Sequence, residues 1–239
     1  MGRAYEFRKA RKFKRWGNMA RTFTRIGKEI DIAVKAAGPE PSNNTRLRIL
    51  LQNAKAANMP KDTIDRAIKR AVSKDTTDYK EIIYEGYAPH GIAIVVETAT
   101  DNHVRTVANV RHAFTKYGGS LGTAGSLDFM FDRKSVFKIN KPENFDIDEF
   151  ELEMIDYGVD EIFEDEDGII NIYGSFDAYG NVHKHLEEHS FDIVSGEFTR
   201  IPTDTKELTP EQRADVDKVL DKLDEDEDVT NAYHNIHED

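Results

Sequence analysis

Three histidines in the second half of the chain are the side chains best suited to chemistry. His183, His185 and His189 fall within seven residues of one another, and neutral imidazole is a frequent zinc ligand. The surrounding residues predict a helix over 176–189, on which residues two positions apart point to different faces. We therefore expect that these histidines hold no metal ion.

An acidic turn at 165–168 and a glycine cluster at 118–126 also have recognisable motifs. The acidic turn resembles the start of a calcium loop, but Phe176 stands at the twelfth position, where such a loop requires a bidentate glutamate. We predict a hairpin turn there. The glycine cluster lacks the Lys-Ser/Thr pair of a phosphate-binding loop and follows a predicted helix instead of opening one. We interpret it as a helix cap and flexible loop, with a backbone contact to RNA, DNA or a protein partner as the alternative.

The remaining sequence offers little to a catalyst. The chain has no cysteine, which excludes disulfides, thiolate metal sites and cysteine nucleophiles. It also lacks a nucleophile elbow, a paired-carboxylate motif and a zinc-protease motif. We expect a protein that is not an enzyme, with no catalytic residue, no cofactor and no small-molecule substrate.

Charge is divided unevenly along the chain. The first eighty residues hold twenty Lys and Arg against eight Asp and Glu, whereas the remainder holds thirteen basic and thirty-seven acidic residues. Concentrated positive charge is typical of a protein that binds a polyanion. Since the acidic remainder would repel the same polymer, we expect nucleic acid to contact only the N-terminal end.

The most basic segment is the start of the chain, where residues 2–28 hold ten basic residues and one acid, interleaved with aromatic residues. Charge repulsion predicts that roughly the first fifteen residues are unpacked when the protein is alone. They could order on a phosphate backbone, with rings available for stacking; a merely solubilising tail is the alternative. The candidate nucleic-acid-binding residues are Arg8, Lys9, Arg11, Lys12, Lys14, Arg15, Trp16, Arg21, Arg25, Lys28, Arg46, Arg48, Lys69 and Arg70.

Three helices must position the later members of that set. An apolar stripe from Phe23 to Ala37, at three- and four-residue steps, predicts a first helix that ends at Gly38-Pro39. Asn44 can cap a second helix, and Met59-Pro60 opens a third. Short amphipathic helices can bury their stripes only against one another, so we expect a helical domain with basic residues on its polar faces.

The acidic part of the chain predicts two α/β units. A strand over 91–99, a helix near 107–117 and a strand over 126–132 form an unfinished βαβ unit. Residues 135–199 complete the order βαββαβ by themselves, which is typical of a ferredoxin-like sandwich.

The chain then ends in a helix over 211–223 and a strand over 229–236, which we place on the unfinished unit. The predicted fold class is therefore multidomain α and α+β, with a three-helix domain followed by two α/β sandwich domains, one ferredoxin-like and inserted in the other. The predicted divisions are 1–76, 77–132 with 201–239, and 133–200.

Apolar segments are short throughout. No run of about 18 apolar residues occurs, and the start has no apolar core of a secretory signal. We expect a cytoplasmic protein that does not enter a membrane.

Several long motifs resemble the YebC family, which also contains the mitochondrial translational activator of cytochrome c oxidase. These are PSNNTRLR at 41–48, AKAANMPKDTIDRAIKR at 54–70, YEGYAPHG at 84–91 and the acidic run that ends in VTNAYHN at 224–235. Two departures indicate a divergent branch. The opening GRAYEFRK at 2–9 replaces a segment that resembles Gly-His-Ser-Lys-Trp, and Ala-Val-Ser at 71–73 replaces glycines.

The resemblance implies three domains, of which one α/β domain is inserted in the other. It also implies a cytoplasmic regulator that binds nucleic acid, usually described as a probable transcriptional regulator that binds DNA. Other members resemble translation factors that act at the ribosome, so a ribosome-associated factor that binds ribosomal RNA is the alternative. The basic and aromatic start of the chain, the arm, favours RNA. The second and third helices lack a clear recognition pattern of a helix-turn-helix.

Overall fold

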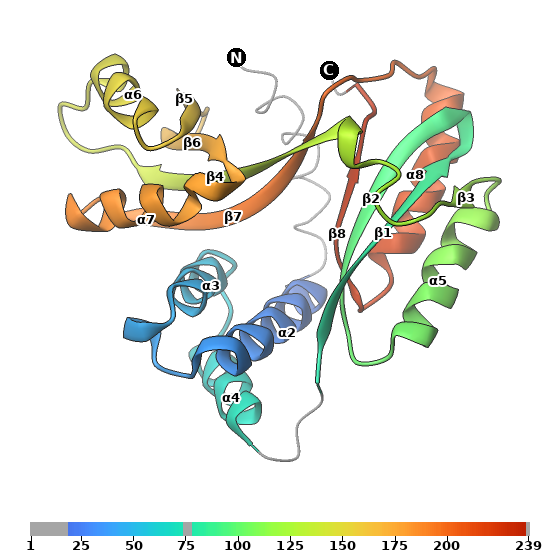
Figure 1. Cartoon of the computed structure of the whole chain (residues 1–239), viewed down its shortest axis with the longest axis horizontal. Coiled ribbons are helices and arrows are strands. Elements are labelled where there is room, and N and C mark those ends of the chain that lie inside the picture. Colours follow the sequence, from blue (N-terminus) through green and yellow to red (C-terminus); the bar gives the residue numbers. More distant parts are fainter. Residues whose placement is uncertain (1–18, 74–77, 238–239) are drawn as a thin grey trace.

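The N-terminal part of the molecule is a compact helical unit. The computed structural model describes residues 19–73 and 78–237, and its first three helices are α2 (Met19–Ala37), α3 (Thr45–Ala56) and α4 (Lys61–Val72) (Figure 1). Their apolar stripes meet in one core, in which Ile30, Leu47 and Ala54 are fully buried. The three predicted helices are thus confirmed.

A buried asparagine joins the first two helices. The side-chain oxygen of Asn44 accepts a hydrogen bond from Leu47 N at 2.9 Å and so caps α3. Its amide nitrogen donates to Ala33 O and Gly38 O, both at 2.8 Å. Gly38 adopts φ +88°, a left-handed conformation that ends α2. One side chain therefore satisfies the backbone at the end of one helix and the start of the next.

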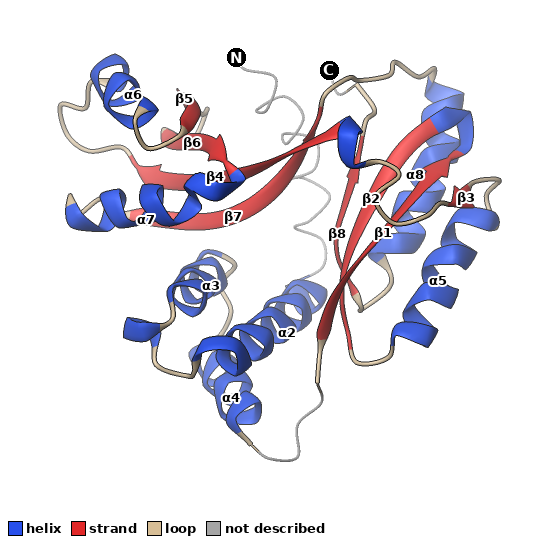
Figure 2. Ribbon diagram, viewed as in Figure 1, coloured by secondary structure: helices blue, strands red, loops and turns tan. Residues whose placement is uncertain are grey.

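The first sheet is antiparallel and is built from distant segments. It contains β1 (Lys80–Ala88), β2 (Ile92–Thr100), β3 (Ser120–Leu121) and β8 (Val229–His234), in the order β3-β1-β2-β8. Helices α5 (His103–Thr115) and α8 (Pro210–Asp224) cover one face and share a core with it (Figure 2).

Two expectations about this sheet were wrong. β1 was not predicted at all, and residues 126–130 of the strand predicted over 126–132 do not form a strand. They turn through a short 3-10 helix, Asp128–Met130, before β4 begins at Phe131. A strand would have put Phe129 on the same face as Leu127 and Phe131, which are buried, but its side chain is 75 % exposed. The unit is therefore an antiparallel sheet and not a βαβ unit.

The second sheet has the predicted ferredoxin-like order. Its strands are β4 (Phe131–Asn140), β5 (Val159–Glu164), β6 (Ile169–Ser175) and β7 (Ile193–Pro202), arranged β5-β6-β4-β7 with every neighbouring pair antiparallel. Helices α6 (Ile147–Ile155) and α7 (Tyr179–Glu188) pack on it. The acidic segment at 165–168 is the predicted hairpin turn between β5 and β6. This sheet interrupts the first one in the chain, so the predicted fold class is confirmed; the numbered domain limits stay a prediction.

The two sheets are joined by a pair of long strands. β4 leaves the first unit and β7 returns to it, and the two are paired from Phe131 opposite Pro202 to Ile139 opposite Ile193 (Figure 1). Side chains of the first sheet hold the returning strand. Arg200 Nε donates to Glu97 Oε1 at 3.1 Å, and the hydroxyl of Tyr233 donates to Phe198 O at 3.4 Å.

Candidate nucleic-acid interface

The predicted nucleic-acid-binding residues divide into two groups. Arg8, Lys9, Arg11, Lys12, Lys14, Arg15 and Trp16 lie outside the described residues. Arg21, Arg25, Lys28, Arg46, Arg48, Lys69 and Arg70 lie on the three helices of the helical unit. Their surroundings differ from helix to helix.

The basic residues of α2 contact the acidic segment, residues 224–228, which begins at the last residue of α8. Arg25 Nη2 donates to Asp224 Oδ1 at 2.9 Å and to its carbonyl oxygen at 3.0 Å. Arg21 Nη1 donates to the same carbonyl at 3.1 Å. Lys28 Nζ donates to Glu227 O at 2.8 Å and to Asp228 Oδ1 at 2.7 Å. Spacings of four and three residues place the three cations on one face of α2, against the negative end of α8.

Asp228 is the centre of this contact. This residue is 3 % exposed, and five donor atoms reach its carboxylate. These are Lys28 Nζ at 2.7 Å, Arg105 Nη2 and Nε at 2.6 and 3.2 Å, Thr106 Oγ1 at 2.9 Å and Thr100 Oγ1 at 3.2 Å. Burial by itself raises the pKa of a carboxyl group, but the hydrogen bonds from Lys28, Arg105 and Thr106 outweigh it and hold the pKa of Asp228 below its ordinary value.

This contact involves two of the residues predicted to contact phosphates, Arg25 and Lys28. Arg25 and Lys28 are 9 % and 6 % exposed, and carboxylate and carbonyl oxygens of residues 224–228 accept hydrogen bonds from both. A phosphate backbone could reach them only after the acidic segment had moved away. Arg21 is half-buried beside them and retains an exposed side-chain fraction of 33 %.

The basic residues of α3 face the two α/β units. Arg46 pairs with Glu81 of β1, and Arg48 Nε lies 3.0 Å from Glu187 Oε1 of α7. Both pairs are partly exposed, so each cation is only partly neutralised and contributes little to stability. They sit at the border between the helical unit and its neighbours, and not on a free face.

In the helical unit, α4 carries several exposed cations. Lys69 and Arg70 are exposed on its last turns, and Lys61 and Arg66 are exposed closer to its start. Arg66 donates within its own helix, to Asp62 O at 3.0 Å and to the hydroxyl of Thr63 at 3.2 Å. The α4 face, Lys61, Arg66, Lys69 and Arg70, is therefore open to solvent, and it contains two of the predicted residues, Lys69 and Arg70.

The glycine cluster is anchored, contrary to the flexible loop that we expected. The buried carboxylate of Glu85 on β1 accepts hydrogen bonds from Gly125 N at 2.9 Å and Leu127 N at 2.6 Å. Gly119 must be glycine, because an added Cβ would lie 2.5 Å from Tyr87 O. Gly118, at φ +86°, ends the turn after α5, as the helix-cap interpretation requires.

A polar cleft of about 730 Å³ opens beside the acidic segment. α5 contributes Arg105 and His112 to its wall, and Lys116 follows that helix; Asp226 and Asp228 lie across from them. Charges of both signs face each other there, so the cleft can bind ions or polar groups. Among the described residues, a group of side chains that could hold a metal ion lies elsewhere, between α6 and α7.

The fold and the separated charges define a three-domain α and α+β protein with a basic helical domain. The chain belongs to the TACO1/YebC family. Residues 3–74 match the TACO1/YebC protein N-terminal domain, and residues 79–236 match the TACO1/YebC second and third domain. Among the described helices, none combines the length and the apolar character needed to cross a membrane.

Relatives match along their whole length. A "Probable transcriptional regulatory protein" of Parabacteroides distasonis is 64 % identical over 239 residues, covering 100 % of this chain and 98 % of the relative. One with the same description from Flavobacterium johnsoniae is 58 % identical over 238 residues, covering 100 % of both. The crystal structure of the conserved hypothetical protein Aq1575 from Aquifex aeolicus is similar, with a TM-score of 0.76, 33 % identity and 92 % and 90 % of the two chains covered.

Proposed function

We propose that the protein is a non-enzymatic regulator of gene expression that binds nucleic acid through its N-terminal domain and basic arm. Separation of charge carries the proposal, since the first eighty residues and the remainder have opposite net charge. The names of the relatives, which describe transcriptional regulators, favour duplex DNA as the ligand. Regulation would then be by occupancy of a DNA site.

Two surfaces would contact phosphates. Residues 1–18 contribute seven Lys and Arg against one Glu, and the α4 face adds four exposed cations. If roughly six to ten phosphate contacts form, the affinity should fall about 10³- to 10⁵-fold between ~50 and ~200 mM salt. Phosphate contacts position a protein without specifying a sequence, so the target site must be read by other groups.

The alternative is a ribosome-associated factor that binds structured ribosomal RNA. One observation favours it. A helix-turn-helix inserts the N-terminal residues of its second helix among the base edges, but the first turns of α4 expose Asp62 and Asp65. Carboxylates at that end would face the phosphates that flank a groove. The basic residues at the other end of α4 suit contacts to a backbone, and Trp16 of the arm could stack on an unpaired base.

Fluorescence anisotropy with labelled duplex DNA and a structured RNA tests the proposal. The variant Arg11→Ala, Lys12→Ala, Lys14→Ala, Arg15→Ala should bind far more weakly and have a flatter salt dependence, with an unchanged melting temperature. Lys69→Ala with Arg70→Ala should weaken binding by a smaller factor. A matched control removes two exposed lysines of the acidic units, Lys184→Ala with Lys218→Ala. Full binding by the arm variant, or an equal loss in the control, would contradict the proposal.

Sedimentation of lysates separates the two ligands. A ribosome-associated factor should migrate with ribosomal particles at moderate salt and leave them at high salt or after ribonuclease treatment. A DNA-binding regulator should remain at the top of the gradient throughout. In the second case, selection of duplex sites from a random pool is the next measurement.

A further inference from the structure

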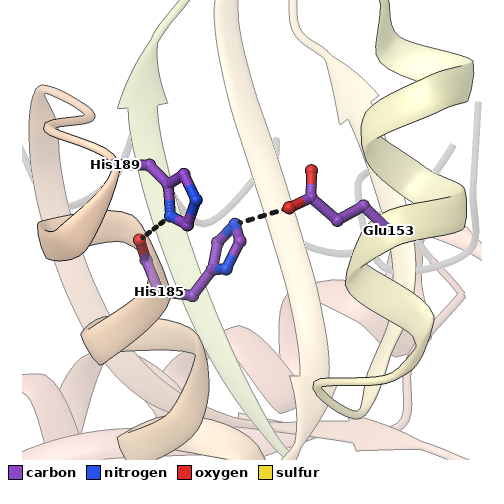
Figure 3. A group of neighbouring side chains, drawn as sticks. All are labelled: Glu153, His185 and His189. Carbon is purple, nitrogen blue, oxygen red and sulfur yellow. Dashed lines mark hydrogen bonds and ion pairs between the residues drawn. The ribbon is translucent and has the colours of Figure 1, made fainter.

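Three side chains from α6 and the end of α7 converge in the ferredoxin-like unit. They are Glu153 of α6, His185 of α7 and His189, which directly follows α7 (Figure 3). One potential ligand atom from each lies within 4.8 Å of the others. The two histidines are four residues apart and therefore share a face, whereas His183 turns the other way, toward Phe137 and Glu187.

His185 is a buried histidine whose ring nitrogens lack hydrogen bonds. It is 2 % exposed, and neither ring nitrogen has a hydrogen-bond partner among the described residues. Tyr157 lies against it, with ring centroids 4.4 Å apart, and Phe150 lies beyond at 6.3 Å. A buried imidazole without partners loses its hydration with no compensation. Its Nε2 is directed at Glu153 (Figure 3).

His189 is held in the orientation that a metal ligand needs. Its Nδ1 lies 3.0 Å from His185 O. A carbonyl oxygen can only accept, so Nδ1 carries the proton and Nε2 carries the lone pair. A hydrogen bond from the second ring nitrogen to a backbone carbonyl is the usual support of a histidine that ligates a metal. The stacked rings of His185 and His189, with centroids 4.1 Å apart, fix both orientations.

The spacing of the ligand atoms fits a metal better than a hydrogen bond. His185 Nε2 and Glu153 Oε1 are 3.4 Å apart, which is long for a charge-assisted hydrogen bond. Two ligands that are each about 2.1 Å from a tetrahedral zinc ion lie about 3.4 Å from each other. Small rotations of the exposed side chains of Glu153 and His189 would bring the remaining distances into the same range.

We propose that Glu153, His185 and His189 form a binding site for a zinc ion or a similar divalent transition metal. Two imidazoles and one carboxylate match the preference of zinc, whereas calcium and magnesium prefer ligands that are all oxygen. Glu153 and His189 also line a surface cleft of about 560 Å³. Water, or a carboxylate or imidazole of a partner, could reach such an ion from this cleft as a fourth ligand.

Binding would connect α6 with the end of α7. The two helices follow different strands and pack on the same sheet, so a shared ion would resist their separation. The proposal does not depend on nucleic-acid binding, because the site lies in the acidic part of the chain and uses none of the predicted phosphate contacts.

Titration calorimetry and thermal melting of the tag-free full-length protein, stripped of metal with EDTA, test the site. Zinc chloride should bind with one ion per chain and raise the melting temperature, whereas magnesium chloride should do neither. Cobalt(II) should give visible absorption bands typical of a four-coordinate site.

Two variants remove one ligand each and retain the local hydrogen bonds. His189→Asn keeps a donor for His185 O, and Glu153→Gln keeps the shape of the side chain. Each should lower zinc affinity by roughly tenfold or more and leave the melting temperature of the metal-free protein unchanged. His103→Gln, at an exposed histidine on α5, should bind zinc as the unaltered protein does.

Two outcomes would overturn the proposal. One is the absence of zinc binding by the unaltered protein. The other is equal zinc affinity in the unaltered protein and in the His189→Asn, Glu153→Gln double variant. Equal binding in the double variant would assign the zinc to other surface residues.

Discussion

The helical domain contacts its two neighbours in two chemically different ways. α2 meets the first unit through Arg25 and Lys28, which are buried against the acidic segment. α3 meets the second unit through Ile49, which is 2 % exposed and belongs to the core of the ferredoxin-like sheet. Beside Ile49, the amide of Asn53 exchanges two hydrogen bonds with the backbone of Gly196, at 2.7 and 3.1 Å.

The two contacts should therefore be sensitive to different changes, one to the loss of a charged group and the other to the loss of side-chain volume. Burial of charge is stable only while every charge keeps its partners, so removal of one group leaves others uncompensated. Apolar contacts depend on filled volume, and changes of pH or of a moderate sodium chloride concentration affect them much less than they affect ion pairs. Gly196 shows the second kind of constraint, because an added Cβ would lie 2.9 Å from the Phe137 ring and 3.0 Å from Ile49 Cγ2.

Removal of the central carboxylate should have the largest effect. Asp228→Ala removes the buried carboxylate that accepts hydrogen bonds from Lys28, Arg105 and two threonine hydroxyls, and we expect a loss of about 3–5 kcal/mol of unfolding free energy. Urea denaturation measures it. Glu227→Ala is the matched control, since this neighbouring side chain is exposed and only its carbonyl binds Lys28. Equal losses in both variants would show that Asp228 is not the centre of the contact.

The apolar contact should be nearly as sensitive to lost volume. Ile49→Ala opens a cavity between α3 and the second sheet and should cost about 2–5 kcal/mol, depending on how far the site relaxes. Leu152→Ala, at a position that is 71 % exposed, controls for loss of an apolar side chain. Denaturation at two salt concentrations separates this contact from the first, because the cost of Ile49→Ala should not change with salt. If the loss of unfolding free energy in Ile49→Ala changed with salt concentration, the contact would not be purely apolar.

Low pH should weaken the charged contact of α2 and leave the apolar contact of α3 unchanged. The pKa of Asp228 is lowered in the folded protein, so the carboxylate stabilises the fold fully above the unfolded pKa of about 3.9. That contribution is lost as pH falls from about 3.9 through the lower folded pKa. The difference in unfolding free energy between the unaltered protein and Asp228→Asn should therefore shrink below about pH 4. A difference that stays constant down to pH 2 would contradict the lowered pKa.

The smallest effect is expected at the edge of the charged contact. Arg21 is partly exposed and lies 3.4 Å from Asp224 Oδ2, so Arg21→Ala should cost about 0–1 kcal/mol and less at high salt. Thermal melting at low and high salt measures this cost. A loss as large as that of Asp228→Ala would mean that the exposed edge, and not the buried centre, stabilises the contact.

Local patterns were sufficient to predict the helical domain and the ferredoxin-like unit. The stripe from Phe23 to Ala37 and the alternating strands after residue 135 each follow one period, and each segment packs against its sequence neighbours. β1 has no such pattern, because Glu81 and Glu85 interrupt its apolar residues and Gly86 breaks the alternation. That glycine is required by packing, since an added Cβ would lie 2.6 Å from Ser120 O.

The surroundings of the candidate residues could not be predicted in the same way. Residue types identified Arg25 and Lys28 as cations, but their acidic partners lie about two hundred positions later in the chain. Likewise, Glu153 joins His185 and His189 only because α6 and α7 pack on one sheet. Helical spacing alone can indicate the i, i+4 histidine pair, whereas the third member depends on tertiary structure.

The paired strands β4 and β7 form a ribbon that connects the inserted unit to the first unit. The ribbon meets the first sheet near Phe131 and Pro202. Hydrogen bonds of Arg200 and Tyr233 hold the ribbon against the first sheet near that point. α3 lies below the inserted unit in Figure 1 and contacts its core through Ile49. The inserted unit could therefore not swing away from the helical domain without separating Ile49 from the core of the second sheet, so the ribbon and this contact together hold the acidic and basic parts of the molecule in one arrangement.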